Sequence, residues 1–100
     1  MSSRKQLLKL SPKARQDIVD ILRYTGETWG QNQLLVYRDK INDALEAISH
    51  TPELGHSHNE LPSTHLVYLV GSHIIVYRIS TDSIGIVRIL HQRMSLVRHV

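Results

Sequence analysis

The dipeptide Trp29-Gly30 separates two amphipathic segments, and this arrangement constrains the fold more than any other part of the chain. The first segment begins at Ser11-Pro12, because serine caps free backbone N–H groups and proline suits the first helical position. Gly30 then suits the left-handed conformation that often ends a helix. The apolar residues between these points recur at helical spacing and form one face: Ala14, Ile18, Ile21, Leu22, Thr25 and Trp29.

The second segment runs from Gln31 to about His50 and repeats the pattern. Because so short a connection reverses the chain, we predict that the two helices form an antiparallel hairpin. Leu35 and Val36 lie off the main stripe, so they are either peripheral packing residues or part of an apolar groove for a partner segment. The stripe itself consists of Leu34, Tyr37, Ile41, Ala44, Leu45 and Ile48.

Short apolar runs on either side of the hairpin predict strands. Gly71-Ser72 suits a tight turn between two of them, and the segment from Thr51 to Thr64 is a loop. The order β-α-α-β-β-β predicts an α+β fold over residues 1–100, a single domain with the helical hairpin packed on one face of a small antiparallel sheet. The expected strands are Lys5 to Leu10, Leu66 to Val70, His73 to Ile79 and Ile84 to His91.

Composition restricts the class of protein. An apolar fraction of 41% over 100 residues fits one globular domain with a single core. The chain has no cysteine, which excludes disulfides and thiolate metal sites. No run approaches the roughly 18 apolar residues of a membrane span, and Met1 to Gln6 lacks a signal-peptide core. We therefore expect a cytoplasmic protein that does not enter membranes.

The end of the chain, Ile84 to Val100, reads as a hydrophobic strand followed by a basic cluster. Strand alternation places Arg88 on the face of Ile84, Ile86 and Leu90, and on the opposite face from His91. The segment from Ile41 to Tyr77 contains no lysine or arginine, so the ending is the main basic feature of the second half. Its cations are Arg88, His91, Arg93, Arg98 and His99.

Several residue types that could support catalysis are present without a recognisable motif. Metal-free RNA cleavage needs a base, an acid and cations for the phosphate. Because successive side chains of a strand point to opposite faces, the available residues would not gather into one catalytic cluster. We therefore expect that the protein is not an enzyme. A solvated or salt-bridged sheet face is the other interpretation of Arg78 and Arg88, and a solvated tail that of Arg93 and Arg98. The candidates are Tyr68, Tyr77, Arg78, Arg88, His91 and Arg93.

Histidines gather in the predicted loop, where His56 and His58 have His50 and His65 nearby. Alternate side chains of an extended segment point to opposite sides, and neither cysteine nor a pair of carboxylates completes a ligand shell. We therefore expect no metal site. The chain also lacks a phosphate-binding glycine loop and a dinucleotide fingerprint, so we expect no cofactor.

Five blocks of sequence, in order and at the right spacing, resemble the ParE toxins of the RelE/ParE superfamily of bacterial toxin–antitoxin systems. Trp-Gly and Leu-His-x-Arg-Met are the more specific elements, and the resemblance covers roughly residues 7 to 100. The blocks are Leu10-Ser-Pro-Lys-Ala14, Tyr24-Thr-Gly-Glu-Thr-Trp-Gly30, Pro52-Glu-Leu-Gly55, Val76-Tyr-Arg78 and Ile89-Leu-His-Gln-Arg-Met94.

The resemblance implies a toxin that poisons DNA gyrase by binding, trapping it with cleaved DNA, and that a cognate ParD-like antitoxin neutralises. Direct contact with nucleic acid is then expected only within the gyrase–DNA complex. Leu35 and Val36 are the candidate antitoxin contacts. We expect removal of the last eight residues to abolish growth inhibition and to leave antitoxin binding intact. The candidate target contacts are Trp29, Arg88, His91, Arg93 and Arg98, with a core or lid position the other interpretation of Trp29.

Two other functions remain open from the sequence. Relatives in the RelE branch cleave messenger RNA on the ribosome, although they carry basic residues in the loop and early strands where this chain has none. ParE members often carry arginine after the Pro-Glu-Leu-Gly segment, where this chain has His56 and His58. A weakly toxic or inert antitoxin-bound module is the third possibility.

Overall fold

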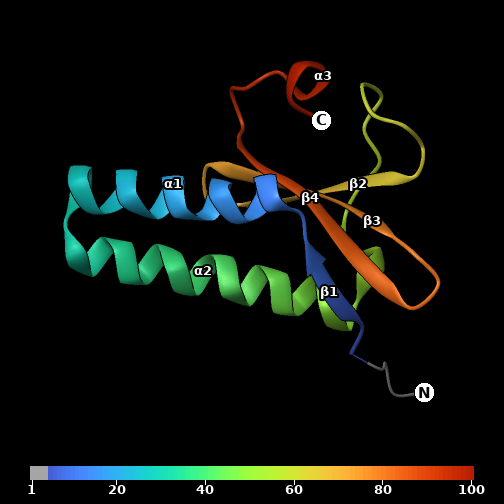
Figure 1. The fold of residues 1–100 in the computed structure, drawn as a ribbon, viewed down its shortest axis with the longest axis horizontal. Coiled ribbons are helices and arrows are strands. Elements are labelled where there is room, and N and C mark those ends of the chain that lie inside the picture. Colours follow the sequence, from blue (N-terminus) through green and yellow to red (C-terminus); the bar gives the residue numbers. More distant parts are fainter. Residues whose placement is uncertain (1–4) are drawn as a thin grey trace.

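Two long helices and a four-stranded sheet make up the protein in a computed structural model that describes residues 5–100 (Figure 1). Helix α1 (Pro12–Trp29) and helix α2 (Gln31–His50) form the predicted antiparallel hairpin. Gly30 joins them with φ of 94°, a conformation that favours glycine. Of the helices in residues 5–100, none is long and apolar enough to cross a membrane. Residues 1–4, part of the segment that lacks a signal-peptide core, lie outside the described residues.

The sheet contains β1 (Leu7–Leu10), β2 (His65–Val70), β3 (His73–Ile79) and β4 (Ser83–His91). Its order is β1-β4-β3-β2, with β1 parallel to β4 and the other neighbours antiparallel. The predicted α+β fold and the element order are confirmed, but the sheet is mixed rather than antiparallel, because β1 runs parallel to β4. Two short elements were not predicted, namely the turn η1 (Pro52–Leu54) and the helix α3 (Leu96–His99).

Ser11 fixes the start of α1 and ties it to the sheet. Its hydroxyl oxygen accepts a hydrogen bond from the N–H of Ala14 at 2.9 Å and donates one to the carbonyl of Val87 at 2.7 Å. Ala14 is fully buried beneath this contact. The Ser-Pro-x-Ala block therefore begins a helix and positions it beside β4 at the same time.

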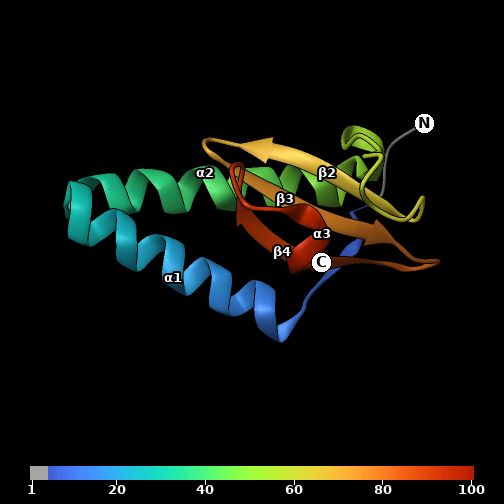
Figure 2. The same ribbon diagram turned by 90° about the horizontal axis from the view of Figure 1, so that it is seen from above.

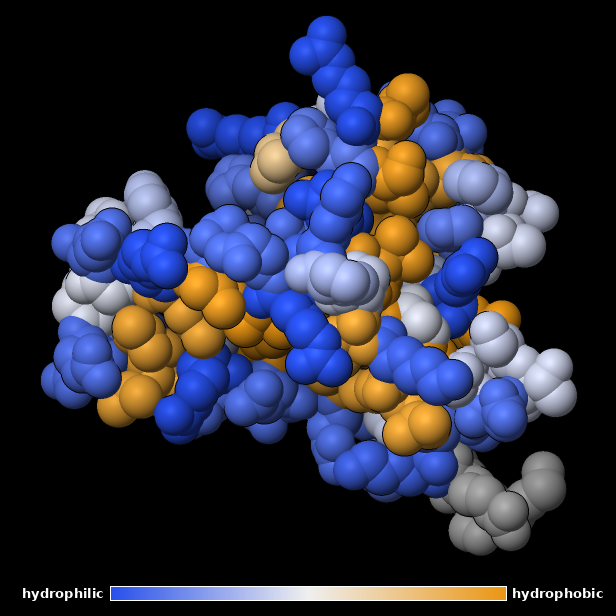
Figure 3. All heavy atoms as spheres, in the orientation of Figure 1, coloured by the Kyte–Doolittle hydropathy of each residue, from blue (hydrophilic) through white to orange (hydrophobic). Residues whose placement is uncertain are grey.

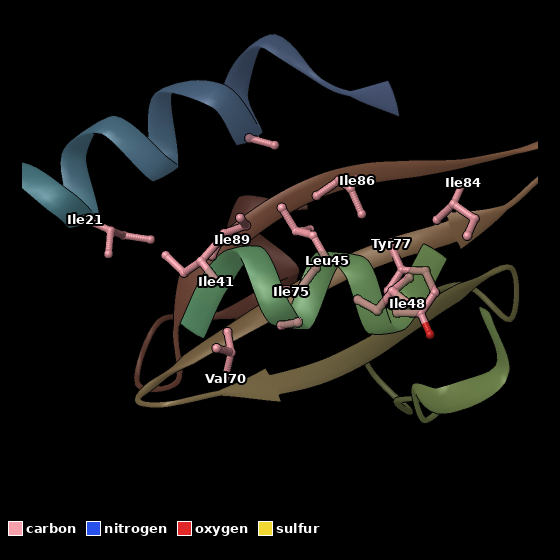
Figure 4. Close-up of a cluster of buried hydrophobic side chains, with 12 residues drawn as sticks. Ile21, Ile41, Leu45, Ile48, Val70, Ile75, Tyr77, Ile84, Ile86 and Ile89 are labelled. Carbon is pink, nitrogen blue, oxygen red and sulfur yellow. The ribbon is translucent and has the colours of Figure 1, made fainter. Parts of the chain in front are cut away.

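The main core lies between the hairpin and one face of the sheet (Figure 4). In that view Ile41, Leu45 and Ile48 of α2 face the side chains of Ile75 and Tyr77 on β3. The stripe predicted for α2 is thus the buried face of that helix. Burial of such side chains contributes about 1.5–3 kcal/mol each relative to leaving them exposed.

A second, smaller apolar cluster covers part of the other sheet face. It is built around Val76, Leu90 and Leu96, the last of which belongs to α3. Figures 1 and 2 both place α3 on the side of the sheet away from α2. The end of the chain therefore folds back over the sheet, with Leu96 only 4% exposed. Arg93 and Arg98, for which a solvated tail was the other interpretation, are both exposed.

A β-bulge in β4 changes which residues share a face. Arg88 pairs with Val76, whereas Ile86 pairs with Tyr77, so Val87 is an extra residue in the ladder. Arg88 therefore does not share a face with Ile84 and Ile86, contrary to the prediction from strict alternation. Leu90 remains on its face, because Leu90 pairs with Ile74, two residues before Val76.

Candidate functional site

The side chain of Arg88 is largely buried and forms a salt bridge within the protein. Its Nε and Nη2 atoms donate to the two carboxylate oxygens of Asp17 at 2.8 and 2.9 Å, and Nη1 donates to the carbonyl of His99 at 2.9 Å. The side chains of Arg88 and Asp17 are only 16% and 12% exposed. The hydrogen bonds that Arg88 donates to Asp17 raise the pKa of Arg88 above its usual value. Of the two interpretations of Arg88, the structure favours the salt bridge over contact with a target.

The remaining cations of the chain end do not form one cluster. His91 pairs with His73, on the sheet face that carries Ile75 and Tyr77 and packs against the hairpin. Arg93 is exposed in the turn after β4, and its backbone N–H donates to Nδ1 of His91 at 3.2 Å. Arg98 is exposed on α3, on the other side of the sheet. The expected basic cluster is therefore divided between two faces of the molecule.

A cavity of about 410 Å³ brings together two of the predicted target contacts, Trp29 and His91. It lies where the tip of the hairpin meets the β2–β3 turn and the end of β4. Trp29 is 69% exposed and Tyr24 is 64% exposed, so Trp29 is not a core residue, and it borders the cavity at the hairpin tip. The cavity is lined by Tyr24, Thr25, Trp29, Gln33, Tyr37, Ser72, His73 and His91.

Tyr37 lines this cavity and forms hydrogen bonds with the β2–β3 turn. Its hydroxyl donates to the carbonyl of Val70 at 3.1 Å, accepts from the N–H of Ser72 at 3.2 Å and lies 2.6 Å from Nδ1 of His73. The ring of His73 meets that of His91 edge-on, with 5.3 Å between ring centroids. Burial, and to a smaller extent the neighbouring His91, lowers the pKa of His73.

Apolar side chains also reach the surface along the hairpin, where they appear as orange patches in Figure 3. Leu35 is 36% exposed and Val36 is 46% exposed. This agrees with the expectation that both are accessible when no antitoxin is bound. Leu34 packs inward instead, and a Cβ at Gly26 would lie 2.8 Å from its Cδ1 atom.

The candidates for RNA cleavage are not brought together. Tyr77 is fully buried, and its hydroxyl donates to the carbonyl of Pro52 at 2.6 Å and accepts from the N–H of Gly55 at 2.8 Å. Tyr68 packs on the hairpin side of the sheet, whereas Arg78 lies on the opposite face. No three histidines or carboxylates within residues 5–100 lie close enough to hold a metal ion.

One arrangement was missed at the level of sequence. Lys9, Gly85, Arg78 and His65 are consecutive partners across all four strands, on the sheet face away from the hairpin. We call Lys9, Arg78 and His65 the basic row. They line a groove of about 580 Å³. The alternation of Lys9 with the apolar Leu8 and Leu10 predicts that Lys9 lies on the sheet face away from the core. Only the register of the strands shows that it lies beside Arg78.

Known proteins resemble this chain over nearly its whole length. A family model described as the ParE toxin of the type II toxin–antitoxin system parDE matches residues 8–96. Toxin ParE1 of Caulobacter vibrioides is 30% identical over 92 residues, which cover 92% of this chain and 95% of that protein. Toxin ParE1 of Mycobacterium tuberculosis is 32% identical over 92 residues, covering 91% and 94%.

Two solved structures share the fold. A chain of the chromosomal ParDE system from P. aeruginosa has a TM-score of 0.75 and 17% identity, over 87% of this chain and 96% of that one. A chain of the RelBE2 toxin–antitoxin complex from Mycobacterium tuberculosis has a TM-score of 0.64 and 16% identity, over 88% and 99%. The extent of the family match and the identity to the two ParE1 toxins show that the chain belongs to the ParE toxin family of type II toxin–antitoxin systems.

Proposed function

We propose that this toxin inhibits DNA gyrase by binding it and stabilising its complex with cleaved DNA, in the cytoplasm and without a catalytic step of its own. Membership of the ParE family supports the target. The placement of the ionisable side chains supports binding rather than catalysis. Arg88 is held by Asp17, Tyr77 is buried, and His91 and Arg98 lie on different sides of the sheet.

The surface around the hairpin tip is the proposed gyrase contact. Trp29 and Tyr24 are large, exposed aromatic side chains beside a cavity that also contains His91. Exposed aromatic residues next to a pocket are typical centres of binding energy. Arg93 is exposed two residues after His91 and is the proposed cation of this contact, whereas Arg98 lies on the opposite side of the sheet.

A ParD-like antitoxin is the proposed second partner. The two structural neighbours come from toxin–antitoxin systems. Leu35 and Val36 on α2 offer apolar contacts to a helical segment. Strand β2 is an edge strand, and His56 pairs with it only at Val67, so Leu69, which is 65% exposed, faces an open edge. An extended peptide can add to such an edge through its backbone.

A gyrase cleavage assay tests the proposal. Purified toxin is added to gyrase, supercoiled plasmid and ATP, and linear DNA is measured after protein is denatured and digested. We expect linear DNA to increase with toxin concentration, and the Trp29→Ala variant to need on the order of tenfold more protein, as for the loss of a central contact. Arg15→Ala, which removes an exposed charge elsewhere on α1, should behave as the wild type.

Two outcomes would overturn the proposal. One is the absence of linear DNA at concentrations at which the toxin stops growth. The other is cleavage of messenger RNA in a translating extract with gyrase unaffected, which would assign the chain to the ribonuclease mechanism. Addition of a candidate antitoxin should suppress DNA cleavage in proportion to its molar ratio.

A further inference from the structure

The basic row lies on the uncovered end of the outer sheet face. Leu96 of α3 packs with Val76 and Leu90 and covers the other end. Adjacent strands are about 4.8 Å apart, so the row extends about 14 Å from β1 to β2. The row runs across the whole sheet, from edge strand β1 to edge strand β2, and strand pairing holds the backbone beneath each of its cations. The row is thus a rigid surface feature, whereas cations on loops are mobile.

No carboxylate neutralises this surface. Within residues 5–100, neither Lys9 nor Arg78 forms a salt bridge, and no aspartate or glutamate lines the groove. The nearby serines Ser80 and Ser83 add hydroxyl groups to the lining. His65 contributes its imidazole, whose Nδ1 lies 3.0 Å from Oγ1 of Thr64. Unpaired cations with hydroxyl donors suit an anionic ligand.

Gly85 keeps the centre of the row open although the fold does not require a glycine there. A Cβ at this position would lie 3.9 Å from Cγ of Arg78, an ordinary van der Waals contact. Its φ is not positive, unlike those of Gly30 and Gly71. Glycine weakens the interior of a strand and often marks a place where a ligand approaches closely. The groove therefore has a floor that a bound group can reach between Lys9 and Arg78.

We propose that the basic row binds the phosphodiester backbone of nucleic acid without reading its sequence. This goes beyond gyrase inhibition and departs from our expectation that nucleic acid is contacted only within the gyrase–DNA complex. The groove lies on the face of the sheet rather than along its edge, so a peptide bound there would not extend the sheet by backbone pairing. Its lining contains no tryptophan, tyrosine or phenylalanine, and His65 is the one ring there on which a base could stack. Phosphate oxygens, in contrast, can use every cation and hydroxyl present.

Fluorescence anisotropy with the whole toxin and labelled oligonucleotides tests this proposal without gyrase. Single-stranded and duplex DNA and single-stranded RNA of several sequences are compared at low ionic strength. We expect weak binding that depends little on sequence. Lys9→Ala and Arg78→Ala should each raise Kd by roughly fivefold and make the slope of log K against log salt shallower by about 0.7–0.9. The three probes identify the form of nucleic acid preferred.

Gly85→Val provides a test that leaves all charges in place. A β-branched residue suits a strand, and its side chain would fill the space between Lys9 and Arg78. We expect Kd to rise by a similar factor, with an unchanged circular dichroism spectrum. Arg15→Ala removes a charge from α1 and should bind as the wild type.

Three results would overturn the assignment. The first is no binding by the wild type at low salt, and the second is wild-type Kd for Lys9→Ala, Arg78→Ala and Gly85→Val. The third is equal competition by an acidic peptide of matched charge, which would assign the row to a protein partner. Failure of the gyrase assay with intact oligonucleotide binding would reject only the proposed target.

Discussion

Asp17 binds Arg88 with both carboxylate oxygens and also accepts the backbone N–H of Ile89 at 2.9 Å. Strand β1 ends at Leu10, opposite Ile86, so the edge of β4 beyond that point has no strand partner. The carboxylate of Asp17 takes the place of the missing strand at Ile89. Through Arg88 it also reaches the carbonyl of His99, and so connects α1, β4 and α3.

We predict that Asp17→Asn destabilises the protein by about 3 kcal/mol, because removal of one partner leaves a largely buried charge unpaired. Urea unfolding followed by circular dichroism would measure the free energy of unfolding. Asp20→Asn is the matched control on the same helix. Asp20 lies 3.9 Å from Arg23 in an exposed pair, which contributes less than about 1 kcal/mol. Equal losses for the two variants would contradict the structural role of Asp17.

The buried hydroxyl of Tyr77 supports a second prediction. Tyr77→Phe leaves the N–H of Gly55 and the carbonyl of Pro52 without their partner, and we expect a loss of about 2 kcal/mol. Tyr68→Phe is the control, since Tyr68 packs on the same core and its hydroxyl makes no hydrogen bond within residues 5–100. A Cβ at Gly55 would lie 2.5 Å from the Tyr77 hydroxyl, so Gly55→Ala should also destabilise. Unchanged unfolding midpoints would contradict this contact.

The parts of the fold that follow from local pattern were predictable. Helical spacing and the Ser11-Pro12 start identified α1, and the apolar stripe of α2 identified its buried face. The bulge at Val87 was not predictable, because it arises from pairing with β3 and leaves no mark on the apolar pattern. Helix α3 is four residues long, too short for a periodic signal.

The site was less predictable than the fold, because it depends on contacts between distant residues. Asp17 and Arg88 are 71 positions apart, and nothing local indicates that they meet. Trp29 and His91 were both selected as candidates, but only the folded chain places them at one cavity. The basic row likewise requires the register of four strands, which the sequence does not specify.

The pKa of His73 predicts how stability depends on pH. Burial lowers this pKa from its ordinary value of 6.5, so between the lowered value and 6.5 the unfolded chain binds a proton more readily. The contribution of His73 is therefore complete above about pH 6.5 and declines as the pH falls. We expect the fall in Tm from neutral to mildly acid pH to be smaller in His73→Gln than in the wild type. His56→Gln is the control, because it removes a histidine from an exposed loop position. An equal fall in Tm in the wild type and both variants would contradict the prediction.

The proposed antitoxin surface can be tested separately from toxicity. Leu35→Glu and Val36→Glu place charges on exposed apolar positions of α2, and we expect each to raise the Kd for a ParD-like antitoxin by about thirtyfold, the effect of losing a contact worth about 2 kcal/mol. Isothermal titration calorimetry would measure this change. Growth inhibition by the free toxin should remain. Asn42→Glu adds the same charge to an exposed position of α2 and should bind normally; wild-type Kd for the first two variants would exclude this surface.

Point variants are a better test of the role of the chain end than removal of the last eight residues. That deletion would take away Leu96, whose loss as Leu96→Ala alone should cost about 2–4 kcal/mol. It would also take away the carbonyl of His99 that binds Arg88. Loss of growth inhibition after the deletion would therefore report instability as readily as a lost contact.

Arg93 and Arg98 are both exposed, so replacing either with alanine should change stability by less than about 0.5 kcal/mol. Because Arg93 lies two residues after His91, which lines the cavity with Trp29, we expect Arg93→Ala to weaken growth inhibition at equal expression. Arg98→Ala, on the other side of the sheet, should retain it. The measurement is growth after induction, with protein levels compared by immunoblot and folding by thermal denaturation. A loss of toxicity in Arg98→Ala, with Arg93→Ala fully toxic, would move the gyrase contact to the face that carries α3.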